Sequence, residues 1–356
     1  MFLDVAELSF SYRAQQVLKH INWQWQAGQQ WAVLGPNGAG KTTLAKALTR
    51  QISPSAGTIS FSADLKQSAI AYVCFEQQKT LCDLDWRFDD SEFQSTAFDI
   101  GTTVQQAILG SAPATDAFTH WSNRLHLKHI LDRGIRFIST GEMRKTLLMQ
   151  ALLSEPELII LDNPLDGLDR ASQQELVVIL DDLLKSEIAV LLLCRQAEDI
   201  PSGVTHILAL DEGSVIAQGD ATQTICNPQV MAIMSPALPA LTPLPAPAQR
   251  PYQLDPNEPL LELHDVSVSY QQNQVLDQIN WTLNKGQHAC ISGPNGCGKT
   301  TLLSLINGDN HKAYGQNIRL FGKLRGSGES VWDIKQKFGV IDTQIQLKHV
   351  RGMKAI

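Results

Sequence analysis

Two glycine-rich segments each place a lysine and a threonine after a turn that can surround phosphate. The first lies between an apolar run at 31–34 and a helix-like stretch rich in Ala and Leu. Its residues are Gly35, Pro36, Asn37, Gly38, Ala39, Gly40, Lys41, Thr42 and Thr43. Glycines let backbone N–H groups turn inward around phosphate oxygens, and the positive end of the following helix favours an anion. In such a loop Lys41 reaches the β- and γ-phosphates of a nucleotide, and Thr42 ligates magnesium.

The second segment has the same spacing and also follows a strand-like run. Its residues are Gly293, Pro294, Asn295, Gly296, Cys297, Gly298, Lys299, Thr300 and Thr301, with Thr300 as the magnesium ligand. One such string can arise by chance, and glycines alone can simply make a turn. Two matches in the same strand–loop–helix setting favour nucleotide binding.

A carboxylate follows a second apolar run. Leu158 to Leu161 are typical of a buried parallel strand, and Asp162 comes directly after them. Strand ends of this kind face the phosphate loop in α/β sheets, so Asp162 is expected to hold magnesium. The alternative is an aspartate that only begins a turn.

Ser139, Gly141 and Glu142 begin a stretch whose apolar spacing predicts a helix. The N-terminus of a helix binds anions, so Ser139 and Gly141 can contact phosphate. The same residues also fit a capping box, in which Ser139 and Glu142 satisfy each other's backbone N–H groups. The residues alone leave both interpretations open.

The elements that position these residues occur twice. The segments from Phe10 and from Val268 align without a gap at an offset of 258 residues. This period is too long for a solenoid unit and indicates duplicated domains. We expect domains at 1–230 and 260–356, joined by a linker at 231–259 in which eight prolines favour extended conformations.

Composition excludes several classes of protein. The 356 residues are 43% hydrophobic and carry a formal charge of −7, so a folded protein without direct nucleic-acid binding is expected. The six cysteines form no CxxC pair and are typical of reduced thiols in a cytoplasmic protein. No run approaches the roughly 18–20 apolar residues of a membrane span, so a membrane role requires a partner.

The order of these motifs resembles the ATP-binding-cassette (ABC) family: a phosphate loop, S-T-G-E in the place of the S-G-G-Q signature, and an apolar strand ending in aspartate. Asp166-Gly167-Leu168-Asp169 then resembles the family's D-loop. The resemblance implies an α/β P-loop NTPase fold of ABC type, in two tandem copies. Each complete copy would have a mostly parallel sheet, an antiparallel β-subdomain near 1–30 and a helical subdomain near 85–140.

The resemblance also implies ATP and Mg²⁺ as cofactors, enclosed between two domains docked head to tail. Ser139 and Gly141 would contact the γ-phosphate of a nucleotide held by the other domain, and Glu142 and Asp169 would also belong to the nucleotide-binding residues. Tyr12 and Tyr270 match the adenine-stacking aromatic; the alternative is a half-buried strand tyrosine. The glutamine that links the γ-phosphate to the helical subdomain is assigned to Gln77, with Gln78 adjacent in register.

Two positions depart from the family pattern. Asn163 stands where the family has the glutamate that polarises the attacking water, and an amide cannot accept a proton. Arg195 stands in the place of the switch histidine, and arginine binds phosphate without shuttling protons. Together they predict a site that holds ATP and hydrolyses it slowly, although drift with residual hydrolysis is the alternative.

The second copy is expected to be incomplete. Ser139 lies 98 residues and Asp162 lies 121 residues after Lys41, whereas 57 residues follow Lys299. The second copy would therefore lack a signature and a magnesium aspartate, and its sheet would have an uncovered edge.

Three functions follow from the resemblance. The first is the ATP-binding subunit of an import system for an oxyanion such as molybdate. It would act with a separate membrane permease at the cytoplasmic face of the inner membrane, and could form a homodimer through its nucleotide-binding domains. The molybdate link rests on likeness of FISTGEMRKTLLMQALLSEPELIILD and LFGKLRGSGESVWDIK to tandem family members associated with molybdate transport.

The second function is that of a soluble tandem ATPase of DNA repair or translation, which the Pro/Ala linker disfavours. The third is a truncated pseudo-ATPase regulator.

Overall fold

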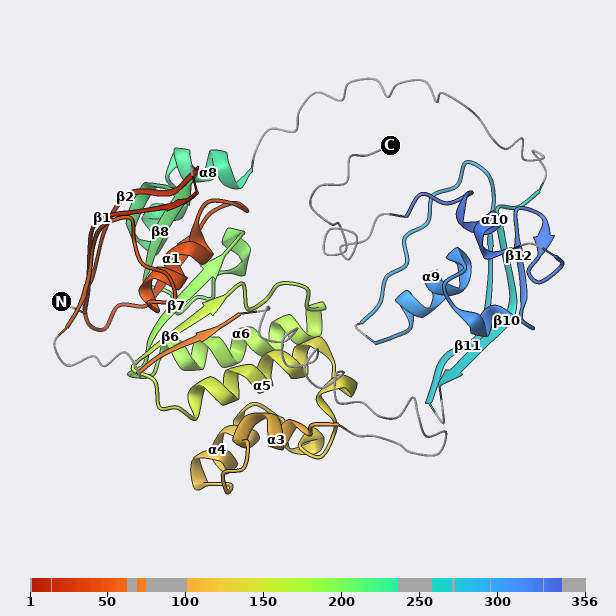
Figure 1. Cartoon of the computed structure of the whole chain (residues 1–356), viewed down its shortest axis with the longest axis horizontal. Helices are drawn as coiled ribbons and strands as arrows, with labels where there is room; N and C mark the ends of the chain where they lie inside the picture. Colours follow the sequence, from red (N-terminus) through yellow and green to blue (C-terminus); the bar gives the residue numbers. More distant parts are fainter. Residues whose placement is uncertain are drawn as a thin grey trace. The chain divides into compact units, whose positions relative to one another are not determined.

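The computed structural model describes residues 2–13, 15–62, 69–74, 101–235, 258–270, 273–294, 296–328 and 330–340. The chain divides into two compact units, Met1–Ala240 and Leu241–Ile356 (Figure 1). This division agrees with the two segments that repeat at an offset of 258 residues.

The first unit contains nine described strands. They are β1 (Leu3–Tyr12), β2 (Gln15–Trp25), β3 (Trp31–Leu34), β4 (Ala56–Phe61), β5 (Ile70–Val73), β6 (Leu158–Asp162), β7 (Ala189–Cys194), β8 (His206–Asp211) and β9 (Ser214–Asp220). Its α-helices are α1 (Lys41–Leu48), α3 (Val104–Leu109), α4 (Asp116–Arg124), α5 (Thr140–Leu152), α6 (Arg170–Leu184), α7 (Ala221–Ile225) and α8 (Pro228–Met234). The last helix, α8, spans the domain boundary expected at residue 230.

A six-stranded sheet in the order β5-β6-β7-β3-β8-β9 forms the centre of this unit. The first five strands run parallel and β9 pairs antiparallel to β8. Because the carboxyl ends of parallel strands lie at one edge, the loops after β3, β6 and β7 meet there. The mostly parallel sheet expected for the family is confirmed.

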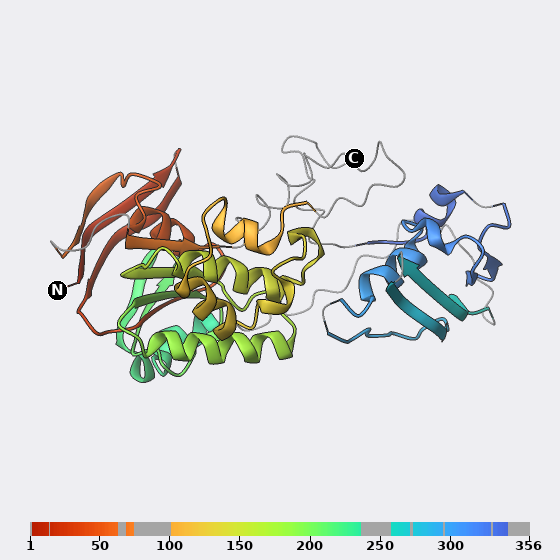
Figure 2. The ribbon, with the colours of Figure 1, turned by 90° about the horizontal axis from the view of Figure 1, so that it is seen from below.

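Two apolar cores cover the two faces of this sheet. Ile159 and Leu161 of β6 pack into the core that contains α5 and α6, whereas Leu158 and Ile160 pack into the core that contains α1 and β1–β2. Alternation of side chains along each strand explains this division. Figures 1 and 2 show α5 and α6 on one side of the sheet and β1 and β2 on the other.

A separate three-stranded antiparallel sheet in the order β2-β1-β4 forms the β-subdomain. It extends beyond the expected region near 1–30, because β4 at Ala56–Phe61 pairs with β1. Helices α3 and α4, with 3₁₀ turns at Lys128–Ile130 and Ile135–Phe137, form the described part of the helical subdomain. Both expected subdomains are thus present.

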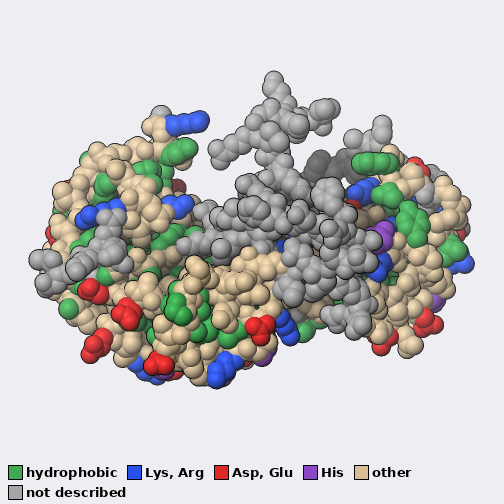
Figure 3. Space-filling view, turned by 60° about the horizontal axis from the view of Figure 1, so that its bottom comes forward, with side chains coloured by type: hydrophobic (Ala, Val, Ile, Leu, Met, Phe, Trp, Pro, Cys, Tyr) green, Lys and Arg blue, Asp and Glu red, His purple; other side chains and the backbone are tan. Residues whose placement is uncertain are grey.

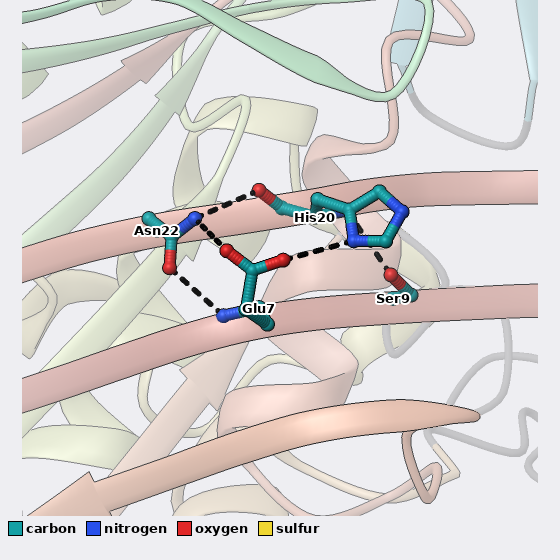
Figure 4. A network of polar contacts seen from close by, with 4 residues as sticks. All are labelled: Glu7, Ser9, His20 and Asn22. Carbon is teal, nitrogen blue, oxygen red and sulfur yellow. Dashed lines mark hydrogen bonds and ion pairs between the residues drawn. The ribbon is translucent and has the colours of Figure 1, made fainter.

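Strands β1 and β2 carry a paired irregularity. Glu7 and His20 both have left-handed backbones, with φ of 51° and 49°. Asn22 accepts from the Glu7 backbone N–H at 2.9 Å and donates to its carboxylate, which also bonds the His20 ring at 2.9 Å (Figure 4). Asp265 and Gln278, at an offset of 258 residues, have φ of 51° and 47° in the second unit. The duplication therefore extends to backbone irregularities.

The second unit contains β10 (Leu261–Tyr270), β11 (Asn273–Leu283), β12 (Asn317–Leu320) and β13 (Lys323–Leu324), in the sheet order β11-β10-β12-β13. Its helices are α9 (Lys299–Asn307) and α10 (Val331–Lys335). An apolar core joins the sheet to these helices through residues such as Leu263, Leu305 and Ile334.

The strand expected before the second glycine-rich loop does not form. Residues 288–291, of which 289–291 correspond to the first three residues of β3, are not in a strand, and His288, Ala289 and Cys290 are exposed. In the first unit β3 is fully buried and hydrogen-bonded on both sides by β7 and β8. No described strand of the second unit offers such pairing, and an unpaired segment gains nothing from extended geometry.

Candidate nucleotide-binding site

The first glycine-rich loop connects β3 to α1, and its carbonyl groups contact the side chain of the lysine that begins α1. Lys41 is 6% exposed, and its Nζ donates to the carbonyls of Gly35 at 2.6 Å and Pro36 at 2.9 Å. Burial lowers the pKa of Lys41, while the negative charge of Asp162 acts in the opposite direction. The ammonium group therefore lies inside the loop, where a phosphate needs a cation.

Glycine at position 40 is required by the shape of this loop. Its φ is 98°, and an added Cβ would lie 2.7 Å from a Leu18 methyl group and 3.1 Å from the Val17 carbonyl oxygen. Gly38 has a φ of 86° but no atom within 4 Å of such a Cβ. The loop backbone thus lies too close to β2 for a side chain at 40, while the space at 38 stays open for a ligand.

This difference gives a paired test of stability. Gly38→Ala should cost about 1–2 kcal/mol of unfolding free energy, because only left-handed strain is added. Gly40→Ala should cost about 2–5 kcal/mol, because overpacking adds to that strain. Urea unfolding followed by tryptophan fluorescence measures both, and equal losses would contradict the close approach to β2.

The expected magnesium residues meet at the carboxyl edge of the sheet. Thr42 Oγ1 donates to Asp162 Oδ2 at 2.7 Å, and the Asp162 side chain is buried. Tyr72 donates to the same oxygen at 3.0 Å, and the Asn163 amide donates to Oδ1 at 2.7 Å. A hydroxyl and a carboxylate oxygen in contact, beside a loop lysine, match the oxygen ligands that Mg²⁺ prefers. The residues present therefore fit Mg²⁺ and a nucleotide.

Tyr72 is a residue that the sequence pattern did not single out. Burial raises the pKa of its phenol, and the nearby charge of Asp162 raises it further. The phenol therefore keeps its proton and acts as a hydrogen-bond donor. The sequence pattern predicts that a tyrosine within an apolar strand packs in the core. The pairing of β5 with β6 brings this tyrosine to Asp162.

A pocket of about 570 Å³ extends from the glycine-rich loop to the end of β1. Tyr12, Gln15 and Lys19 line one part of it, and Gly38 and Thr43 line another. The Tyr12 ring is 63% exposed rather than half-buried, and the Arg13 guanidinium lies 5.9 Å from its centroid. An aromatic surface beside a phosphate loop can stack a nucleobase.

The signature residues begin α5 and form the capping box. Ser139 Oγ accepts from the Glu142 N–H at 3.2 Å, and Glu142 accepts from the Ser139 N–H at 2.7 Å. Although burial acts to raise it, hydrogen bonds from Ser139 hold the pKa of Glu142 below its usual value. The His129 ring lies 3.5 Å from the same carboxylate. This capping leaves the Ser139 hydroxyl hydrogen able to donate to an anion.

The signature helix is tied to the turn after β6. Arg144, which the sequence pattern did not single out, is 6% exposed and donates to the carbonyls of Asn163 at 3.2 Å and Asp166 at 2.9 Å. Asp169 caps α6 by accepting from the Ser172 N–H at 3.0 Å, and a Cβ on Gly141 would meet Ser172 Oγ at 3.0 Å. The sequence offered one sign that Arg144 has a structural role, which is its position as a basic residue on the buried face of a predicted helix.

The two departures from the family pattern have specific contacts. Asn163 has a left-handed backbone with φ of 48°, a conformation that asparagine tolerates better than most residues. Arg195 donates to Asp166 Oδ1 at 2.7 Å, in an ion pair that is partly exposed. Gln77, Gln78 and Asn295 lie outside the described residues, as does the side chain of Tyr270.

Two glycines of the second glycine-rich loop repeat the backbone angles of the first, with φ of 82° at Gly296 against 86° at Gly38. Gly298 has a φ of 93°, and Lys299 Nζ donates to the carbonyls of Gly293 at 2.7 Å and Pro294 at 2.6 Å. The difference lies around it, because this lysine and Thr300 are more exposed than their counterparts. Among the described residues of this unit, no carboxylate pairs with Thr300.

Two further observations concern the charged side chains on the surface and the hydropathy of the described helices. On the face in Figure 3, acidic and basic side chains lie interspersed. No helix among the described parts of the chain is long and apolar enough to cross a membrane.

Comparison with known structures gives the same fold. A structure of cbiO1 from Clostridium perfringens, part of an ABC transporter complex, superposes with a TM-score of 0.51 at 23% identity, over 65% of this chain and 92% of that one. An ATP-binding cassette of an ABC transporter in its ADP conformation gives a TM-score of 0.52 at 18% identity, over 65% and 97%. At these identities the likeness concerns the fold.

Comparison with known sequences gives the family. The sequence model described as ABC transporter matches residues 18–166 and 276–352. The ABC transporter ATP-binding protein ModF of Escherichia coli is 34% identical over 98% of this chain and 71% of its own length. An uncharacterized ABC transporter ATP-binding protein of Schizosaccharomyces pombe is 28% identical over 97% and 72%. With matches in both units, the chain belongs to the ATP-binding proteins of the ABC transporter family.

Proposed function

We propose that the first unit binds Mg·ATP as a stable complex and hydrolyses it slowly. The observation that carries this proposal is the contact of Thr42 with Asp162 beside buried Lys41, at a site where Asn163 takes the position of the base. Lys41 would hold the β- and γ-phosphates, Thr42 and Asp162 would hold Mg²⁺, and Tyr12 would stack on adenine. Bound Mg²⁺ would neutralise phosphate charge.

Slow hydrolysis follows from the groups near Asp162. The Asn163 amide is a donor to the Asp162 carboxylate, so it cannot take a proton from water. Arg195 is held by Asp166, and arginine binds phosphate without shuttling protons. Loss of a general base typically lowers a rate by about 10²- to 10⁴-fold.

A complete site requires a second domain. Ser139 caps the N-terminus of α5 and has a hydroxyl hydrogen that could bond an anion outside its own unit. We therefore propose a homodimer in which Ser139 of each first unit faces Lys41 of the other. A separate membrane permease would be the further partner, at the cytoplasmic face of the inner membrane. Similarity to ModF supports transport of an oxyanion such as molybdate as the physiological role.

The test is equilibrium ATP binding together with steady-state phosphate release on the purified chain. We expect binding that Mg²⁺ strengthens, with turnover well below the median enzyme value of about 10 s⁻¹. Sedimentation with and without Mg·ATP measures the dimer. Absence of ATP binding would overturn the proposal, and turnover at or above that median would overturn the assignment of Asn163 as a lost base.

A further inference from the structure

We propose that Tyr72 is a positioning residue of the magnesium site, whose phenol orients the Asp162 carboxylate toward Thr42. This inference rests on the proposed function, because it concerns how the same site holds its metal ion. Tyr72 acts through Asp162 and is not itself a metal ligand in this proposal.

The strand pairing brings the phenol to this place. β5 pairs parallel with β6, with Tyr72 opposite Ile160, two residues before Asp162. Tyr72 and Ile160 both pack in the core that contains α1, and Asp162 has the same parity as Ile160. Tyr72, Asp162 and the helix that carries Thr42 therefore lie on one face of the sheet.

The hydrogen bonds of Asp162 divide between its two oxygens. Oδ2 accepts from the Thr42 hydroxyl at 2.7 Å and the Tyr72 phenol at 3.0 Å, while Oδ1 accepts from the Asn163 amide at 2.7 Å. All three donors are neutral. They fix the orientation of a carboxylate without cancelling the negative charge that attracts a cation.

Tyr72 differs from the other two donors because it has no second role at the metal ion. Thr42 would become a ligand through an oxygen lone pair, even if its hydroxyl hydrogen continued to bond Asp162. The Asn163 amide belongs to the turn after β6 and contacts the other oxygen. The phenol of Tyr72 comes from a different strand and would still hold Oδ2 when the metal is bound. Hydrogen-bond partners of this kind commonly change metal affinity by about 10- to 100-fold when removed.

The experiment compares Tyr72→Phe with the matched variant Tyr314→Phe, which removes a phenol hydroxyl in the second unit. All proteins carry Lys299→Ala, so that the second glycine-rich loop does not contribute. The ATP dissociation constant is measured in EDTA and then during a Mg²⁺ titration. We expect Tyr72→Phe to raise the Mg²⁺ concentration at half-maximal effect by about 10- to 100-fold, with the EDTA value within about twofold of the parent.

The phenylalanine ring retains the packing of Tyr72, and thermal unfolding in EDTA checks this. If Tyr72→Phe fails to fold, Tyr72→Gln and Tyr72→Leu replace it, and the inference requires the amide donor to keep the lower Mg²⁺ requirement. In an Asp162→Asn background, Tyr72→Phe should have no further effect. An unchanged Mg²⁺ requirement in Tyr72→Phe would overturn the inference. Failure of the parent protein to bind ATP would instead overturn the proposed function.

Discussion

Lys41→Ala should weaken ATP binding to the first unit by about 100-fold. The ammonium group is buried in the loop and bonds two loop carbonyls, so it is already placed where phosphates would lie. A hydrogen bond to a charged group contributes about 1.5–3 kcal/mol, and about 1.4 kcal/mol corresponds to a factor of ten. ATP titration in the Lys299→Ala background measures the effect.

The matched control is Lys185→Ala, which removes an exposed lysine whose partner Asp182 lies 4.0 Å away. This variant should bind ATP like the parent. If Lys41→Ala and Lys185→Ala bound ATP equally, phosphate binding in the first loop would be wrong. A loss with Lys299→Ala alone would place the nucleotide in the second unit.

Asn163→Glu should raise the rate of ATP hydrolysis at saturating Mg²⁺ by about 100-fold or more, because it supplies a carboxylate at the position of the missing base. The structure also predicts two costs. Glutamate tolerates φ of 48° less well than asparagine, so about 1 kcal/mol of unfolding free energy should be lost. The donor to Asp162 Oδ1 disappears as well, so more Mg²⁺ should be needed.

Asn163→Gln distinguishes the effect of a general base from the effect of side-chain length, because glutamine has the length of glutamate but no carboxylate. Steady-state phosphate release should rise in Asn163→Glu and stay at the parent level in Asn163→Gln. An equal gain in both variants would show that side-chain length matters. No gain in Asn163→Glu would mean that another departure, such as Arg195 in the place of the switch histidine, limits the rate.

Local spacing accounts for where several of the predicted site residues lie. Lys41 and Thr42 lie in a loop whose shape depends on Gly40, and Asp162 ends a strand whose alternation assigns it to the face of α1. These features depend on a few consecutive residues and on the two-residue period of a strand. The paired left-handed residues Glu7 and His20, in contrast, leave no simple trace in composition or periodicity.

Features that depend on distant partners could not be predicted in this way. Tyr72 and Arg144 meet the site through strand order and helix packing, across 90 and 19–22 residues of sequence. The residues before the second loop have the composition of a strand but do not form one. A strand needs a hydrogen-bonded neighbour, and a local sequence pattern does not show whether that neighbour is present. Pairing, rather than propensity, decides these cases.

The segment at 288–291, exposed except for the partly buried Ile291, distinguishes the second glycine-rich loop from the first. Amide hydrogens of β3 should exchange with solvent only on large-scale opening, whereas those of 288–291 should exchange nearly as fast as in a free peptide. If a loop anchored on such a segment holds its binding shape for only part of the time, its apparent affinity falls by that fraction. Slower exchange at 288–291 on addition of phosphate would therefore reveal a binding site that orders as it fills.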